Sequence, residues 1–233
     1  MIKKNLITIL LVLISFSAFS QRMIFRRDSV SYTPRVKKWG RNAPNMLFPY
    51  VQLNWALGPQ SDGARVHLGH SVNFRLGLDY KRKITRWFHI GVKLQYATET
   101  FRLVQDYHKV VPDTILHQSE WFNLQSFVSG GFLRFNLGKQ RISSYGIYIE
   151  TGVNHVWAIR FFHVYNEELP GGESQQTRTH NLAYTLPNYG EAYVKFGWTH
   201  IAAVTTVRFT PLFRTPYGYP DMPIVKLGME AAF

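Results

Sequence analysis

The segment His117-Gln118-Ser119-Glu120 holds side chains that could carry out acyl transfer. A histidine close to a serine can take the hydroxyl proton and create a nucleophile, provided that an acid orients the imidazole ring. Here Glu120 directly follows Ser119, and no separate acid can be assigned to support His117. The segment also falls in a predicted loop or at a strand tip, where polar residues are common. We therefore predict no catalytic residues and keep an enzyme as an alternative.

Ten other ionisable residues alternate with apolar neighbours, which predicts that they occupy one face of their segments. Five are cations and five are anions. Such a balance predicts a structural network of salt bridges, because an unpaired buried charge costs several kcal/mol. A proton or ion path is the functional alternative. The predicted network consists of Arg75, Asp79, Lys93, Glu99, Glu150, Glu191, Lys195, Arg208, Lys226 and Glu230.

No residues are predicted to bind a metal or a cofactor. The chain has no cysteine, which excludes thiolate ligands, disulfides and cysteine nucleophiles. Its nine histidines show no metal-binding spacing apart from the scattered pair His67 and His70. The glycine-, serine- and glutamine-rich stretch 169–180 is typical of a loop tip, and it lacks the strand-to-helix context of a phosphate-binding loop.

The elements that must position these residues are β-strands, since apolar residues recur at every second position over most of the chain. Within 119–137 the alternation changes phase near Gly130-Gly131, where we predict a β-bulge. Eight strands are predicted, within 50–58, 71–80, 88–100, 119–137, 145–157, 191–198, 203–211 and 225–233.

The two faces of these strands differ in an unusual way. The polar face carries glycines and isolated charges, whereas the apolar face is large and aromatic on every strand; aromatic residues make up 15% of the chain. A soluble sandwich would instead expose a face rich in lysine, glutamate and threonine. Small and charged residues inside with bulky residues outside suit a narrow barrel in lipid. We predict an all-β fold, an eight-stranded antiparallel transmembrane β-barrel.

The connections between the predicted strands alternate in length. The long connections are 58–70, 102–118, 160–186 and 213–222, and the short ones are 81–86, 138–144 and 199–200. Outer-membrane barrels have short periplasmic turns and longer external loops. The pattern therefore predicts that both termini are periplasmic.

The first residues have the features of a secretory signal peptide. Lys3 and Lys4 precede an apolar run that is too short to cross a membrane as a helix, and Ala18-Phe19-Ser20 suits a cleavage site. The predicted organisation is a signal peptide at 1–20, a basic periplasmic segment at 21–44 and a barrel domain at 45–233. Export argues against a nucleic-acid partner, despite a net charge of +13.

Basic residues gather in the 21–44 segment, which has little apolar patterning. We expect Arg26, Arg27, Lys37 and Lys38 to contact either anionic lipid headgroups or an acidic periplasmic protein. The outer loops contain more acids than cations, so the predicted charge is polarised towards the periplasmic side.

Four stretches resemble the small outer-membrane β-barrel families of Bacteroidetes-type bacteria, including the PorT-like family: HIGVKLQY (89–96), YGIYIETGVN (145–154), VRFTPLF (207–213) and VKLGMEAAF (225–233). The resemblance implies an outer-membrane location in a Gram-negative bacterium. Phe233, which ends an alternating strand, looks like the signal recognised by the barrel-assembly machinery. By contrast, the His-x-Ser pattern of barrel lipid-A deacylases continues with asparagine, where this chain has Glu120.

Three functions follow as hypotheses. The first is a non-enzymatic anchor or accessory subunit of an envelope complex, for which the resemblance offers type IX secretion as an example. The second is a lipid-modifying barrel enzyme, and the third is a small pore. A narrow barrel filled by its own side chains disfavours the pore, and the incomplete motif at His117 disfavours the enzyme.

Overall fold

The strands of this protein close into a barrel. The computed structural model describes residues 38–40, 43–137, 146–169, 172–180 and 182–233. The predicted signal peptide, most of the 21–44 segment and the predicted short turn at 138–144 lie outside these residues. Within the described ranges no helix is long and apolar enough to span a membrane.

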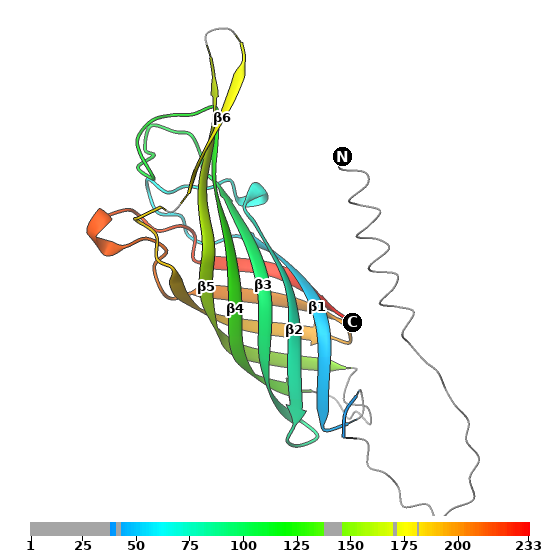
Figure 1. Cartoon of the computed structure of the whole chain (residues 1–233). Coiled ribbons are helices and arrows are strands. Elements are labelled where there is room, and N and C mark those ends of the chain that lie inside the picture. Colours follow the sequence, from blue (N-terminus) through cyan, green and yellow to red (C-terminus); the bar gives the residue numbers. More distant parts are fainter. Residues whose placement is uncertain (1–37, 41–42, 138–145, 170–171, 181) are drawn as a thin grey trace, which may run out of the picture. The chain divides into compact units, whose positions relative to one another are not determined.

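The described residues form nine antiparallel strands (Figure 1). Eight of them, all except β6, form a ring, because β1 pairs with both β2 and β9, and β4 pairs with both β3 and β5. The predicted eight-stranded antiparallel barrel is therefore confirmed. The strands are β1 (Asn45–Ala56), β2 (Val72–Lys83), β3 (Phe88–Arg102), β4 (Ser119–Asn136), β5 (Ile147–Glu168), β6 (Ser174–His180), β7 (Asn188–Trp198), β8 (Ile201–Arg208) and β9 (Val225–Ala232).

The two ends of the barrel differ in their connections. At one end, the short-turn end, residues 84–87 join β2 to β3, and Thr199-His200 joins β7 to β8. At the other, the long-loop end, longer segments join β1 to β2, β3 to β4 and β8 to β9. These segments include the 3-10 helices η1 (Leu68–His70) and η2 (Thr215–Tyr217).

The predicted loop 160–186 contains a strand pair, so this part of the prediction is wrong. Strand β5 continues to Glu168 and then pairs with β6, from Phe162 opposite His180 to Glu168 opposite Ser174. Figure 1 shows this β5–β6 hairpin projecting beyond the other strands. Both faces of β6 carry polar side chains. Its sequence therefore lacks the alternation of apolar and polar residues that marks the barrel strands.

The bulge predicted near Gly130-Gly131 is also wrong. Both glycines lie in continuous register with β3 and β5. The irregularity occurs instead where Gln125 faces Arg160 and Ser126 faces Ala158, so that Ile159 is the extra residue on β5. After this bulge the alternation of buried and exposed side chains on β5 ends, and the four residues from Phe161 to Val164 are all buried.

The interior has two chemically different halves. Towards the long-loop end, buried apolar side chains from the strand ends and the folded loops form one cluster, which we call the apolar plug. It includes Phe101, Phe122, Leu124, Val128, Phe161, Leu212, Phe213 and Met222. Charged and polar side chains, together with aromatic rings, fill the rest of the interior. The plug thus closes the barrel with loop residues rather than leaving an open mouth at this end.

Aromatic side chains inside the barrel lie over glycines on neighbouring strands. Tyr148 faces Gly197 directly across the β5–β7 ladder, and a Cβ at Gly197 would lie 2.0 Å from the Tyr148 ring. The same arrangement occurs in the pairs Tyr50–Gly77, Phe132–Gly91 and Tyr193–Gly152. The glycines noted on the polar face therefore make room for large inward rings, which fill the narrow interior.

Candidate functional site

Glu150 on β5 is the centre of a buried charge cluster. Its carboxylate lies 3.2 Å from the Nζ atoms of both Lys93 and Lys195. Arg134 donates a hydrogen bond of 2.8 Å through Nε, and the Tyr193 hydroxyl donates one of 2.9 Å. Because these donors come from β3, β4 and β7, one carboxylate ties four strands together.

Two further acids complete this set, which we call the Glu150 cluster. Lys195 lies 2.5 Å from Glu230 on β9, and Asp79 on β2 lies 3.8 Å from Lys93 and 3.9 Å from Lys195. In the described part of the chain the cluster holds three acids and three cations, so its formal charge is balanced: Asp79, Glu150 and Glu230 against Lys93, Arg134 and Lys195.

Aromatic rings surround the cations of this cluster. The Lys93 Nζ lies 4.1 Å from the centroid of the Tyr193 ring, and the Arg134 guanidinium lies 4.1 Å from that of Tyr148. Lys195 lies 5.0 Å from the Tyr50 ring. Such contacts stabilise cations that have been removed from water, and the rings belong to the aromatic–glycine pairs described above.

A second buried network, the Glu191 cluster, crosses the barrel between the Glu150 cluster and the apolar plug. Glu191 on β7 pairs with Arg75 on β2 at 2.7 Å and with Lys226 on β9 at 2.6 Å. Lys226 also lies 3.0 Å from Glu99 on β3. Arg75 in turn donates a 2.7 Å hydrogen bond to Asn73, which accepts another from Asn54.

All ten residues of the predicted charge network are buried. Nine belong to the two clusters. The tenth, Arg208, pairs instead with the loop residue Asp221 at 3.0 Å and donates a hydrogen bond to the Met222 carbonyl. The prediction omitted Arg134, which is also buried and pairs with Glu150. Asp221 lies in a loop, where no periodicity marks it.

The residues of the candidate hydrolase segment have other partners. The His117 ring lies 3.1 Å from the Glu167 carboxylate and stacks on Tyr165. The Ser119 hydroxyl accepts a hydrogen bond from Asn166. Each therefore contacts β5; among the described residues the His117 Nε2 atom has no hydrogen-bond partner, so no hydrogen bond joins it to Ser119.

Glu120 takes part in a buried contact that the sequence did not predict. It pairs with Lys109 at 2.5 Å and with His163 at 2.6 Å, and it accepts a hydrogen bond from Gln105. Lys109 also donates to the Ile115 carbonyl and lies 3.4 Å from Asp113. We call these contacts the loop latch, since they fasten the loop between β3 and β4 to the barrel wall. A single lysine in a loop gives no sequence signal for such a role.

Loop aromatics cover the apolar plug. The rings of Tyr184, Phe213 and Tyr219 lie edge to face or tilted against one another. Burial, followed by the nearby Tyr219, raises the pKa of the Tyr184 hydroxyl above its ordinary value. This side chain therefore stays neutral and serves packing.

The ring centroids of His67 and His70, the scattered pair, lie 6.2 Å apart, and the His70 N–H donates a 3.0 Å hydrogen bond to the His67 carbonyl. Across the described ranges, no group of three histidine or acidic side chains is arranged to hold a metal ion.

The remaining predicted contact residues lie near the short-turn end or outside the described ranges. Lys38 is exposed, and its carbonyl accepts a 3.1 Å hydrogen bond from the Asn45 side chain. Phe233 is 68% exposed and donates its N–H to the Pro49 carbonyl at 3.0 Å. Arg26, Arg27 and Lys37 belong to the undescribed part.

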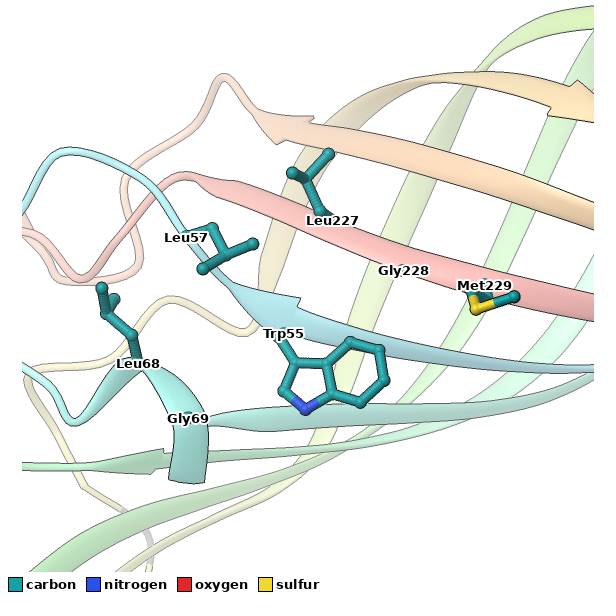
Figure 2. Close-up of a pocket in the computed structure, with 7 residues that line it drawn as sticks. All are labelled: Trp55, Leu57, Leu68, Gly69, Leu227, Gly228 and Met229. Carbon is teal, nitrogen blue, oxygen red and sulfur yellow. The ribbon is translucent and has the colours of Figure 1, made fainter.

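Large apolar side chains cover the barrel exterior, as Leu94 at 66% and Phe196 at 54% exposure illustrate. One shallow hollow of about 290 Å³ lies where β1 meets β9, beside η1 (Figure 2). Figure 2 shows Trp55 of β1 and Met229 of β9 at this seam, and the lining is apolar throughout: Trp55, Leu57, Leu68, Gly69, Leu227, Gly228 and Met229.

Neither protein-family models nor curated proteins give a match to this chain. The resemblance to PorT-like barrels thus stays a prediction.

Proposed function

We propose that the protein is a non-enzymatic outer-membrane barrel that serves as an anchor or accessory subunit of an envelope complex. The observation that carries the proposal is the inverted polarity of the barrel. Charged residues such as Glu150 and Lys195 are buried inside, whereas Leu94 and Phe196 face outwards. A lipid surround accounts for this polarity, since apolar exterior side chains then contact hydrocarbon.

The alternation of turns supports an orientation with the short-turn end in the periplasm. Arg82 and Lys83 end β2, Arg86 lies in the turn that follows, and no acid occurs from Tyr80 to Thr98. With the basic 21–44 segment, this end suits anionic headgroups or an acidic periplasmic partner. A role in type IX secretion rests on the resemblance alone.

The filled interior favours an anchor over a pore. Arg75 on β2 reaches Glu191 on β7 across the barrel, and the apolar plug lies above this contact. The enzyme hypothesis is disfavoured because, in the described part of the chain, no hydrogen bond joins His117 to Ser119, whose hydroxyl bonds to Asn166 instead.

Three measurements test the proposal. The protein should fractionate with the outer membrane, and it should give no single-channel conductance in planar bilayers. Native-membrane purification of the wild type and of a variant with Arg26, Arg27, Lys37 and Lys38 changed to glutamine should differ in co-purified periplasmic proteins. Steady conductance would favour the pore, and identical co-purified proteins would reduce the basic segment to a lipid contact.

A further inference from the structure

The exterior of the barrel carries a second, larger hollow. Its volume is about 700 Å³, and it extends over β2, β3, β4, β5 and β7. Its floor follows one row of cross-strand partners, in which Val92 faces Gly131, Gly131 faces Val153 and Val153 faces Ala192. We call this hollow the lateral groove.

The groove exists because two positions of this row have little or no side chain. Gly131 leaves a gap between Val92 and Val153, and Ala192 fills less space than the residues around it. Packing does not require the glycine: a Cβ at Gly131 would meet only the Gly91 carbonyl oxygen, at 3.9 Å. At the neighbouring inward Gly91, by contrast, a Cβ would lie 2.2 Å from the Phe132 ring. Packing inside the barrel therefore requires glycine at position 91 but not at position 131.

The groove is charged at one end only. Exposed Arg82 lines it, directly opposite Ile90 on the ladder between β2 and β3. Lys83 follows Arg82 in the chain, and Arg86 lies in the adjoining turn. Apart from Tyr80 and Thr151, whose hydroxyls bond to Asn45 and to the Tyr193 carbonyl, the lining is otherwise apolar.

The groove also rises from the short-turn end towards the middle of the barrel. Arg82 lies two positions before Ile84, where the β2–β3 turn begins, whereas Ala192 lies seven positions before Thr199 of the β7–β8 turn. Five neighbouring strands spaced by about 4.8 Å give the row a length of roughly 19 Å. This length is comparable to the thickness of one hydrocarbon leaflet, about 15 Å.

We propose that the lateral groove binds one anionic glycerophospholipid of the periplasmic leaflet. The phosphate contacts Arg82 at the membrane boundary, and an acyl chain lies along Gly131 towards Ala192. The proposal rests on the membrane placement proposed above. The positive charge at one end and the apolar lining beyond it suit an amphiphilic anion. A second copy of this barrel fits less well, because it would place its own Arg82 where a negative charge is needed.

The test is native mass spectrometry of the chain purified in detergent and titrated with phosphatidylglycerol or phosphatidylcholine. Wild type should bind phosphatidylglycerol more tightly. Arg82→Gln should weaken this binding about fivefold, the effect of one cation near a lipid surface, with little effect on phosphatidylcholine. The double variant Gly131→Leu/Ala192→Leu should weaken the binding of both lipids.

Two matched controls accompany these variants. Arg86→Gln removes the same charge from the turn, and Ala203→Leu enlarges an exposed alanine on β8; neither residue lines the groove, and both variants should bind like wild type. The proposal would be overturned if Arg82→Gln and Arg86→Gln weakened phosphatidylglycerol binding equally. It would also be overturned if Gly131→Leu/Ala192→Leu bound both lipids like wild type. Chemical cross-linking tests the alternative, a second copy of the barrel in the groove. The proposal would also be overturned if the wild type gave a cross-linked dimer that Gly131→Leu/Ala192→Leu lost while still binding lipid normally.

Membrane placement is measured separately, by refolding into lipid vesicles and comparing heated with unheated samples on gels. A chain that inserts as a heat-modifiable barrel but shows no Arg82-dependent binding contradicts only the lipid site. A chain that fails to insert contradicts both the lipid site and the proposed membrane function.

Discussion

Tyr50 faces Gly77 directly across the ladder between β1 and β2, and its ring occupies the space that a side chain at position 77 would need. A Cβ at Gly77 would lie 2.5 Å from the Tyr50 Cζ. Since the ring also packs beside Lys195, it has little room to move. Tyr50 therefore packs against the barrel wall at Gly77 and against the buried Lys195 at the same time.

Gly77→Ala should destabilise the barrel by about 1–3 kcal/mol, the usual cost of overpacking a filled interior. Urea unfolding of the refolded protein, followed by its migration on unheated gels, measures the change. The matched control is Gly69→Ala, because no atom lies within 4 Å of a Cβ at that position. Equal stability of the two variants would show that the Tyr50 ring moves aside at little cost.

Glu150→Gln should be the most disruptive single change in the charged interior. It leaves Lys93, Arg134 and Lys195 without their shared carboxylate. Removing one partner from a buried ion pair costs about 3–5 kcal/mol. Exposed Glu173→Gln serves as the control, and urea unfolding compares the two. A loss below about 1 kcal/mol would mean that water reaches the cluster and screens its charges.

Lys109→Met should release the loop between β3 and β4 while keeping most of the apolar stem. Because its ammonium group contacts Glu120 inside the loop latch, proteolysis between residues 103 and 118 should accelerate at least about tenfold. Tyr107→Ala in the same loop should have little effect, since Tyr107 is 96% exposed. Equal cleavage of the two variants would show that other contacts hold the loop.

The absence of cysteine allows the orientation to be mapped with single introduced thiols. Under the proposed placement, an impermeable thiol reagent added to intact cells should label Glu173→Cys, next to the β5–β6 hairpin. It should label Ile84→Cys, in the turn after β2, only after the outer membrane has been opened. The reverse pattern would invert the orientation.

Alternation predicted the barrel because every ring strand places one face inside, and it succeeded most clearly on β3, where Lys93 is buried between exposed Val92 and Leu94. It failed on β4 for a physical reason. There the interior changes from charged to apolar, so Leu124 and Val128 point inwards while Ser129 points outwards. The polarity of the two faces reverses while the register between β3 and β4 stays continuous, and the reversal looks like a bulge near Gly130-Gly131.

The clusters show the corresponding limit for the candidate site. Periodicity identifies Glu150 and Lys195 as inward residues, but their contacts depend on how the barrel closes. Lys109 and Asp221 reach the interior from loops, where no period exists. Such contacts depend on the path of the folded loops, which a pattern of alternation does not contain.

Strand β5 has 22 residues, and its axial rise of about 3.3 Å per residue gives a length of roughly 70 Å. A tilted strand crosses a bilayer with about 9–11 residues. Under the proposed placement, about half of β5 therefore stands in water. The long strands β3, β4 and β5 then continue from a stem within the membrane into a head outside it, whose apolar plug is protected by loops rather than by lipid. Such a head can open or unfold at the cell surface while its stem stays anchored.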